Sequence, residues 1–204
     1  MEIKPYYEEP GITIYHGDCR EILPHLPKVD LVLTDPPYGI GKAGWDSEYI
    51  TGWERVAMNL SKSGLVMNAG EQEICTAIKS LGDDYRGLFY GWNRNGMTRS
   101  SIGYMNIIVA VVAGKVKMGQ NFCQFTIKDL TRKNHPSPKP IEYVICLITR
   151  FSDEGALILD PFMGSGTTLV AAKQLGRRAI GIEIEQRYCK IAVDRLRQEV
   201  FDFK

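Results

Sequence analysis

Residues 157–169 read LILDPFMGSGTTL, and this stretch decides the predicted fold. It begins with an aliphatic run typical of a buried strand, which ends at Asp160, and continues through a glycine-bearing turn into a helix. In the turn, Gly164 and Gly166 allow backbone N–H groups to approach a ligand closely. We therefore expect a strand, a ligand-binding turn and a helix, the unit from which open α/β sheets are built.

The class of ligand is narrowed by what the turn contains and what it lacks. A phosphate-binding P-loop needs a Gly-Lys-Ser/Thr sequence, which this turn does not have. A dinucleotide fingerprint, as in nicotinamide-dependent oxidoreductases, is incomplete because Leu169 fills its third glycine position. The next predicted strand ends at Glu183, about 20 residues further on, where a carboxylate can accept both ribose hydroxyls of an adenosine-type cofactor. The helix after the turn is expected to be capped by the hydroxyl of Ser165, Thr167 or Thr168.

The rest of the chain continues this alternation of strands and helices. Seven short apolar runs are predicted strands: Ile12–Tyr15, Leu31–Thr34, Gly64–Asn68, Leu88–Trp92, Asn106–Ala113, Ala156–Asp160 and Ala179–Glu183. Apolar residues have helical spacing in segments 74–81, 141–148, 169–175 and 188–196. This order predicts a largely parallel sheet covered by helices on both faces. Between Leu88 and Ala113 two strands follow each other directly, which indicates an antiparallel pair.

A second strand end, in residues 30–39 (DLVLTDPPYG), carries unusual chemistry. Pro36 and Pro37 remove two backbone donors, so the carbonyl oxygens of Asp35 and Pro36 are free to accept hydrogen bonds. A carboxylate and a carbonyl beside the ring of Tyr38 suit an exocyclic amine on a flat ring. For two adjacent prolines alone, a stiffened turn with a capping aspartate is the simpler interpretation.

Length and composition set the broad class of protein. The 204 residues, 44% of them hydrophobic and 24% charged, suit one domain with a real core and exclude a disordered chain. The longest aliphatic run, Ile107–Ala113, is far shorter than the roughly 20 apolar residues of a membrane span. The amino-terminal residues contain no export signal, so a cytoplasmic protein is expected. Five single cysteines without a CxxC pair predict neither a disulfide framework nor a metal site.

Positive charge is concentrated in about one quarter of the chain. Between Arg86 and Lys139, nine basic residues accompany a single acid, which gives +8, whereas the remaining residues carry −7. Such a segment can present its charge to a polyanion, although a solvated face that binds nothing would look the same. Aromatic residues that suit either nucleic-acid bases or a core are interleaved with these charges: Tyr90, Trp92, Tyr104, Phe122 and Phe125. The candidate DNA contacts are Arg94, Arg99, Lys115, Lys117, Arg132 and Lys133.

Four motifs together resemble one known family. TDPPY (34–38), HPSPKP (135–140), DPFMGSGTT (160–168) and GIE (181–183) are similar to motifs of the S-adenosylmethionine-dependent amino-DNA methyltransferases. Their order resembles the β class, in which DPPY precedes the FxGxG turn. The resemblance implies a seven-stranded Rossmann-like methyltransferase sheet with helices on both faces and a circularly permuted motif order. It also implies a single methyltransferase domain over residues 1–204, with a short target-recognition insert at about 93–134.

The resemblance further implies roles for individual residues. S-adenosylmethionine is the implied cofactor, with Glu183 on its ribose hydroxyls and Asp18 on its adenine. Its other contacts would come from the turn and from the Lys-Pro pair: Lys139, Pro140, Asp160, Phe162, Gly164, Ser165, Gly166 and Thr167. The implied catalytic set is Asp35, Pro36, Pro37 and Tyr38. In that set the carboxylate and the first proline carbonyl accept the two amine hydrogens of a flipped-out base, and the tyrosine stacks on the base.

The implied activity is methyl transfer to N6 of adenine in double-stranded DNA. Within the family DPPY usually accompanies adenine N6 and SPPY leans to cytosine N4, so cytosine N4 is the first alternative. RNA or a protein glutamine is a further acceptor, but relatives with that activity carry NPPY, and Asp35 replaces the asparagine here. A DNA-binding module with a degenerate site is the non-enzymatic alternative. Neither a metal nor a membrane is an expected partner, and the short recognition segment leaves a homodimer open.

Overall fold

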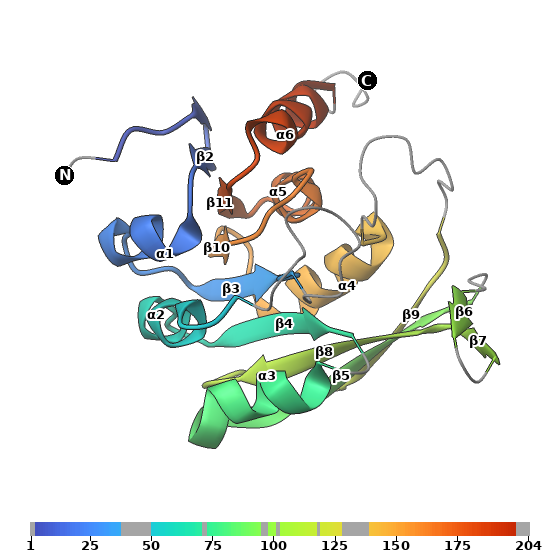
Figure 1. The fold of residues 1–204 in the computed structure, drawn as a ribbon. Helices are drawn as coiled ribbons and strands as arrows, with labels where there is room; N and C mark the ends of the chain where they lie inside the picture. Colours follow the sequence, from blue (N-terminus) through green and yellow to red (C-terminus); the bar gives the residue numbers. More distant parts are fainter. Residues whose placement is uncertain are drawn as a thin grey trace.

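The computed structural model describes residues 3–37, 50–70, 73–94, 98–100, 103–117, 119–127 and 139–198. Most of its strands form one large sheet with helices on both sides (Figure 1). The strands of that sheet are β1 (Tyr7–Glu9), β2 (Ile12–His16), β3 (Leu31–Thr34), β4 (Leu65–Ala69), β5 (Tyr85–Asn93), β8 (Ile107–Ala113), β9 (Phe122–Phe125), β10 (Leu157–Asp160) and β11 (Arg178–Glu183). A separate pair consists of β6 (Thr98–Ser100) and β7 (Gly103–Met105). The helices are α1 (Cys19–Ile22), α2 (Trp53–Leu60), α3 (Ile74–Leu81), α4 (Ile141–Phe151), α5 (Thr167–Gln174) and α6 (Gln186–Gln198), with 3-10 turns at Leu23–His25 and Gly82–Asp84.

The order of strands across the large sheet is β1-β2-β11-β10-β3-β4-β8-β5-β9. From β2 to β4 all neighbours are parallel, whereas β8 is antiparallel to both β4 and β5. The seven predicted strands are confirmed as the seven central members of this sheet, and β5 with β8 is the predicted antiparallel pair. The four predicted helical segments are confirmed as α3, α4, α5 and α6.

The sheet has nine strands rather than the expected seven, because one short strand is added at each edge. Strand β1 pairs antiparallel with β2, and β9 pairs parallel with β5. Both are three or four residues long and contain polar side chains, so neither carries a recognisable alternating pattern. They become strands because the outer strands of the central seven present unpaired backbone groups. Strand β9 and the β6–β7 pair lie within the predicted recognition insert.

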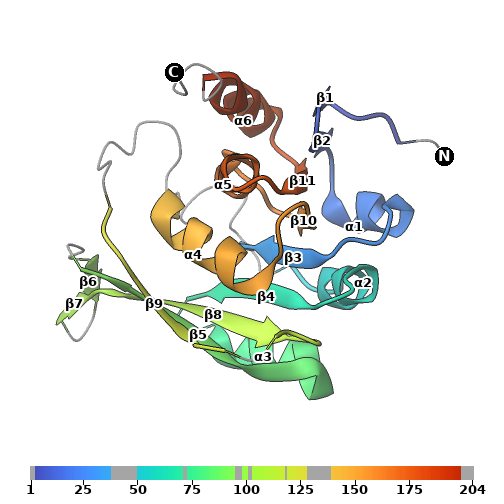
Figure 2. The same ribbon diagram turned by 180° about the vertical axis from the view of Figure 1, so that it is seen from behind.

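Helices α1, α2 and α3 cover one face of the sheet, and α4, α5 and α6 cover the other, as Figure 2 shows from behind. All four residues of β3 are buried. Leu31 and Leu33 pack into the core beneath α4 and α5, whereas Val32 packs into the core on the opposite face. This burial on both faces explains why β3 is a continuous aliphatic run rather than an alternating one. In the part of the chain that is described, no helix is long and apolar enough to cross a membrane.

The connections that follow β3 and β10 lead to opposite sides of the sheet. The chain leaves β3 and returns through α2 to β4 on one side, whereas it leaves β10 and returns through α5 to β11 on the other side. Open α/β sheets bind their ligands outside the carboxyl ends of the strands at such a switch point. The sheet therefore brings the ends of the two strands that carry the DPPY and FxGxG motifs to the expected ligand position.

Candidate active site

The two motif-bearing strand ends are joined directly by a buried hydrogen bond. The Thr34 hydroxyl at the end of β3 donates to Asp160 Oδ1 at the end of β10, at 2.7 Å. Both side chains are buried, so water does not compete for this contact. Asp35 follows Thr34 immediately, and the glycine turn follows Asp160. The predicted catalytic and cofactor residues therefore lie together beyond the carboxyl ends of the parallel strands, at what we call the edge of the sheet that carries Asp35.

Asp35 is held by a lysine from a distant part of the chain. Lys139 Nζ lies 2.7 Å from each carboxylate oxygen of Asp35, and both side chains are largely shielded from solvent. Lys139 immediately precedes Pro140, the N-cap of α4, so the predicted start of a helix after the Lys-Pro pair is confirmed. Sequence reasoning assigned Lys139 to the cofactor, whereas its ammonium contacts the predicted catalytic carboxylate. Pro36 and Pro37 are buried, and Tyr38 lies outside the described residues.

Asp160 organises the start of the glycine turn. Its Oδ1 accepts the backbone N–H of Phe162 at 3.1 Å as well as the Thr34 hydroxyl. Burial raises the pKa of Asp160 to about 6, although hydrogen bonds from Thr168, Thr34 and Phe162 favour its charged form. The Phe162 ring packs edge-on against Trp53 of α2, with the ring centroids 5.0 Å apart.

The predicted hydroxyl cap of helix α5 is wrong. The N-cap is Gly166, with a left-handed φ of 80°, and no side chain caps the helix. The three hydroxyl residues have other partners: Arg195 of α6 donates to the Ser165 and Thr167 hydroxyls at 3.2 and 3.1 Å, and Thr168 hydrogen-bonds Asp160. Helix α6 thereby holds the turn from behind, because Arg195 also donates to the Ser165 carbonyl at 2.7 Å.

Replacing Gly166 with alanine should destabilise the protein by about 3 kcal/mol, which combines left-handed backbone strain with overpacking. A Cβ at Gly166 would lie 2.7 Å from the Ala192 Cβ. Gly155→Ala is a matched control, because Gly155 has a φ of +73° but no heavy atom within 4 Å of an added Cβ. Chemical denaturation should show the control losing only about 1 kcal/mol, the strain alone. Equal losses in the two variants would contradict a close approach of α6 to the turn.

Glu183, the last residue of β11, closes the other side of the turn. Its Oε2 accepts the backbone N–H of Gly164 at 3.0 Å, and its Oε1 accepts that of Glu185 at 2.7 Å. Burial raises the pKa of Glu183 to about 7, the two N–H donors oppose this shift, and the Asp160 and Glu185 carboxylates add to it. A buried carboxylate so close to neutral titration is typical of a ligand site.

Asp18 lies beside Glu183 because β2 and β11 are neighbours. The N–H of Gly17 donates to the Glu183 carbonyl at 3.0 Å. Asp18 is the N-cap of α1 and accepts from the backbone N–H of Arg20 at 2.8 Å. The Arg20 guanidinium also binds both Asp18 oxygens, and this hydrogen bonding lowers the pKa of Asp18. Asp18 therefore lies at the ends of the strands where the cofactor is predicted, and its carboxylate is already hydrogen-bonded to Arg20.

The predicted DNA contacts separate into two locations. Arg94 is exposed just after β5, at the edge of the sheet that carries Asp35. Lys115 and Lys117 follow β8, which runs in the opposite direction, so they lie at the opposite edge and are not brought to the site. Arg99 belongs to β6, and Arg132 and Lys133 lie outside the described residues. Of the interleaved aromatics that are described, Trp92 and Phe122 are exposed and Phe125 is buried.

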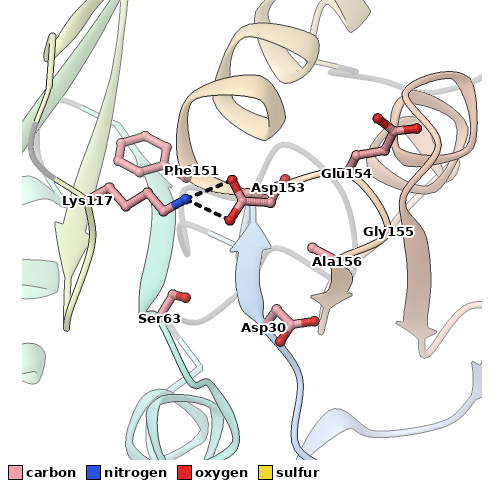
Figure 3. Close-up of a pocket in the computed structure, with 9 residues that line it drawn as sticks. Asp30, Ser63, Lys117, Phe151, Asp153, Glu154, Gly155 and Ala156 are labelled. Carbon is pink, nitrogen blue, oxygen red and sulfur yellow. Dashed lines mark hydrogen bonds and ion pairs between the residues drawn. The ribbon is translucent and has the colours of Figure 1, made fainter.

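A pocket of about 320 Å³ lies at that opposite edge, where Asp30 precedes β3 and Ala156 precedes β10 (Figure 3). Lys117 Nζ contacts the Asp153 carboxylate there at 2.6 and 2.7 Å. The pocket lies beyond the amino ends of these strands, so it does not belong to the candidate active site. Among the described residues, no three His, Cys, Asp or Glu side chains form a cluster that could hold a metal ion.

Two polar residues near the site were not singled out from the sequence. Asn68, at the end of the apolar run of β4, and Tyr143, on the apolar face of α4, are buried and hydrogen-bonded to each other. The signal in the sequence is a polar residue within a strand whose other residues are all apolar.

The fold and the site are those of an α/β methyltransferase whose cofactor contains an adenosine-type nucleoside. A family model described as DNA methylase (N6_N4_Mtase) matches residues 112–194. The type II methyltransferase M.ScaI of Streptomyces caespitosus is 31% identical over 257 residues, covering 96% of this chain and 84% of that protein. The DNA adenine methyltransferase YhdJ of Escherichia coli (strain K12) is 28% identical over 241 residues, covering 90% and 82%. The crystal structure of the M1.HpyAVI–SAM complex superposes with a TM-score of 0.73 at 26% identity, covering 91% of this chain and 98% of that one.

This chain belongs to the N6/N4 DNA methyltransferase family, as a β-class amino-DNA methyltransferase with S-adenosylmethionine as its cofactor. The residues present fit this cofactor on chemical grounds. A buried carboxylate, Glu183, ends the strand after the turn, where ribose hydroxyls can donate to it. The turn itself contains glycines at 164 and 166, where the backbone can approach a ligand without a side chain intervening.

Proposed function

We propose that this DNA methyltransferase transfers a methyl group from S-adenosylmethionine to N6 of adenine in double-stranded DNA. The observation that carries the proposal is the Asp35 carboxylate at the end of β3, one residue from the hydrogen bond between Thr34 and Asp160. Adenine is favoured over cytosine by the aspartate that begins DPPY and by the similarity to YhdJ, which is named as an adenine methyltransferase.

The acceptor amine needs activation, because its lone pair is delocalised into the base ring. The base also has to leave the duplex before any side chain can reach the amine. Asp35 and the Pro36 carbonyl accept the two amine hydrogens, which shifts the nitrogen toward a tetrahedral geometry and frees its lone pair for attack. Lys139 pairs with both oxygens of Asp35 and so fixes the orientation of this carboxylate toward the substrate. Tyr38 stacks on the extruded base.

When bound, the cofactor would supply an electrophilic methyl group on a sulfonium. Its carbon–sulfur bond would break with the electron pair staying on sulfur, which leaves as a neutral thioether, and the methylated amine would lose one hydrogen as a proton to water. Glu183 holds the ribose hydroxyls, and Asp18, on the neighbouring strand end, accepts from the adenine amine. Phe162, fixed by Trp53, and the backbone of Gly164 and Gly166 line the remainder of the binding site. Ser165 and Thr167 contribute through Arg195, which orders the turn. Pro140, at the start of α4, borders the methionine end.

Duplex DNA binds along the edge of the sheet that carries Asp35. Arg94 offers a cation there, and Trp92 and Phe122, which expose 39% and 43% of their surface, offer flat apolar area beside it. Strand β9 pairs with the carboxyl-terminal half of β5, and the β6–β7 pair lies beyond that end of β5 in both ribbon views. In this proposal these strands form the recognition segment. Lys115 and Lys117 take no part, since they lie at the other edge.

The target base can be determined by digesting DNA methylated by the pure protein to nucleosides. With tritiated S-adenosylmethionine, we expect the label in N6-methyladenine and none in N4-methylcytosine. Label in N4-methylcytosine would assign the alternative target while leaving the mechanism of amine activation intact. Label that appears only with RNA or protein acceptors would contradict the proposed substrate class.

A further inference from the structure

A chain of buried hydrogen bonds lies behind the candidate active site. Asn68 is the penultimate residue of β4 and is 4% exposed, and its Nδ2 donates to the backbone carbonyl of Thr34 at 3.3 Å. Its Oδ1 accepts from the hydroxyl of Tyr143 at 3.0 Å. Tyr143 is fully buried in the first turn of α4. The two polar groups therefore join α4 to β4 and β4 to β3.

Thr34 is the shared point of this chain. Its carbonyl accepts from Asn68, its hydroxyl donates to Asp160, and its peptide continues directly into Asp35. A shift of the Thr34 backbone would therefore carry Asp35 with it and strain the hydrogen bond to Asp160, so the catalytic carboxylate would move relative to the cofactor turn.

The chain of contacts returns to Asp35 from the other side. The N–H of Tyr143 donates to the Pro140 carbonyl at 3.1 Å, and Lys139, one residue earlier, contacts both Asp35 oxygens. Asp35 is thus held through its backbone by Thr34 and through its side chain by Lys139. Tyr143 and Asn68 connect these two supports inside the core.

The polar groups occupy a site that apolar side chains could fill. Buried hydroxyl and amide groups cost free energy unless they are hydrogen-bonded, whereas a tyrosine ring alone would supply the packing. Strand β5 leaves room for that ring at Gly91, where an added Cβ would lie 2.4 Å from Tyr143 Cε2. The hydroxyl and the amide thus need an explanation beyond filling space.

We propose that Asn68 and Tyr143 are positioning residues for methyl transfer, which fix Thr34 so that Asp35 and the cofactor turn keep their relative placement. This inference rests on the proposed role of Asp35. Neither residue touches the base or the cofactor in the proposal, so they act on the rate of the chemical step rather than on binding.

The test uses Asn68→Leu, Tyr143→Phe and the double variant, with Val66→Ala as control. Val66 lies two residues before Asn68 on the same strand and packs into the same core, but makes no side-chain hydrogen bond. Single-turnover methyl transfer at saturating DNA should fall about 100-fold in Asn68→Leu and about tenfold in Tyr143→Phe, because small misplacements of reacting groups are costly. Calorimetric affinity for S-adenosylmethionine should stay within about threefold of the wild-type value.

The double variant separates positioning from stability. With leucine at 68, the buried tyrosine hydroxyl has lost its acceptor, so removing that hydroxyl should raise the melting temperature above that of Asn68→Leu. The methyl-transfer rate should nevertheless stay at the level of Asn68→Leu. If the methyl-transfer rates of all four variants, including Val66→Ala, fell in proportion to their melting temperatures, loss of stability alone would explain them and the inference would be overturned. If Asn68→Leu does not fold, Tyr143→Phe alone decides, since an unchanged rate in that variant refutes it. Failure of the proposed function is distinguishable, because the wild-type protein would then transfer no methyl group to DNA.

Discussion

Asp35→Ala should reduce methyl transfer to DNA by about 1,000-fold, the upper range for removal of a group that stabilises charge in a transition state. The alanine cannot accept an amine hydrogen, so the nitrogen lone pair stays delocalised into the base. Binding of S-adenosylmethionine should change only a few-fold, because Glu183 and the glycine turn lie on β10 and β11 and keep their own hydrogen bonds. Tritiated methyl transfer and calorimetry measure the two quantities separately.

The chain provides a matched control for this variant. Asp153 is also contacted by a lysine through both oxygens, at 2.6 and 2.7 Å from Lys117 Nζ, but it lies at the opposite edge of the sheet. Asp153→Ala should therefore transfer methyl groups at the wild-type rate. An Asp35→Ala protein that retains more than a tenth of the wild-type rate would contradict the catalytic role of Asp35.

Glu183→Ala should weaken binding of S-adenosylmethionine by at least about 100-fold. Two charge-assisted hydrogen bonds from the ribose hydroxyls are lost, each worth about 1.5–3 kcal/mol. The carboxylate also orders the turn through the N–H of Gly164, so part of the loss comes from a looser turn. Glu185→Ala is the control, because Glu185 lies two residues further on and pairs with Arg187 at the surface. That variant should bind the cofactor nearly as well as the wild type.

The pH dependence gives a second measurement of the same role. The pKa of Glu183 is raised to about 7, so the carboxylate is largely protonated at pH 6 and largely ionised at pH 8. Only the ionised form accepts both hydroxyls, so affinity should rise with pH and be about tenfold greater at pH 8 than at pH 6. Asp160, whose pKa is raised to about 6, adds to the loss at the acid end of this range.

Glu183→Gln removes the titrating group and should flatten most of this rise. Glu185→Ala should keep the rise but displace it to lower pH, because the Glu185 carboxylate contributes to the raised pKa of Glu183. An affinity that does not change between pH 6 and pH 8 in the wild type would contradict contact between the ribose and Glu183.

The central fold could be predicted from the sequence because its strands are unusually explicit. Strand β3, strand β10 and the buried second half of β8 are aliphatic runs with neither polar interruption nor proline, as is typical of strands buried on both faces. Strand β9 and helix α1 could not be predicted, since four residues carry no usable period. Their structure is determined by their neighbours.

The candidate site could likewise be predicted from the sequence only in part. Asp160 and Glu183 each end a strand and Asp35 directly follows one, and polar residues at such positions can be recognised locally. The partner of Asp35 could not, because Lys139 is 104 positions away and only the fold brings it there. Lys117 is a case in which the local signal is misleading. Its charge predicts a DNA contact, but β8 is antiparallel to β4, so Lys117 lies at the opposite end of the strands from Asp35. Similarly, the hydroxyls at 165 and 167 look like helix caps until Arg195 is known to engage them.

The position of β3 at the reversal of the connections has a consequence for how the protein is made. One neighbour, β4, follows β3 soon along the chain, but the other, β10, begins with Leu157, whose N–H hydrogen-bonds Asp30 from 127 positions away. On the ribosome, β3 therefore has one side without its neighbouring strand until residues 157–160 have been synthesised. Until then the growing chain also lacks the glycine turn that follows β10, so it cannot hold the cofactor, and the unpaired side of β3 is open to misassembly.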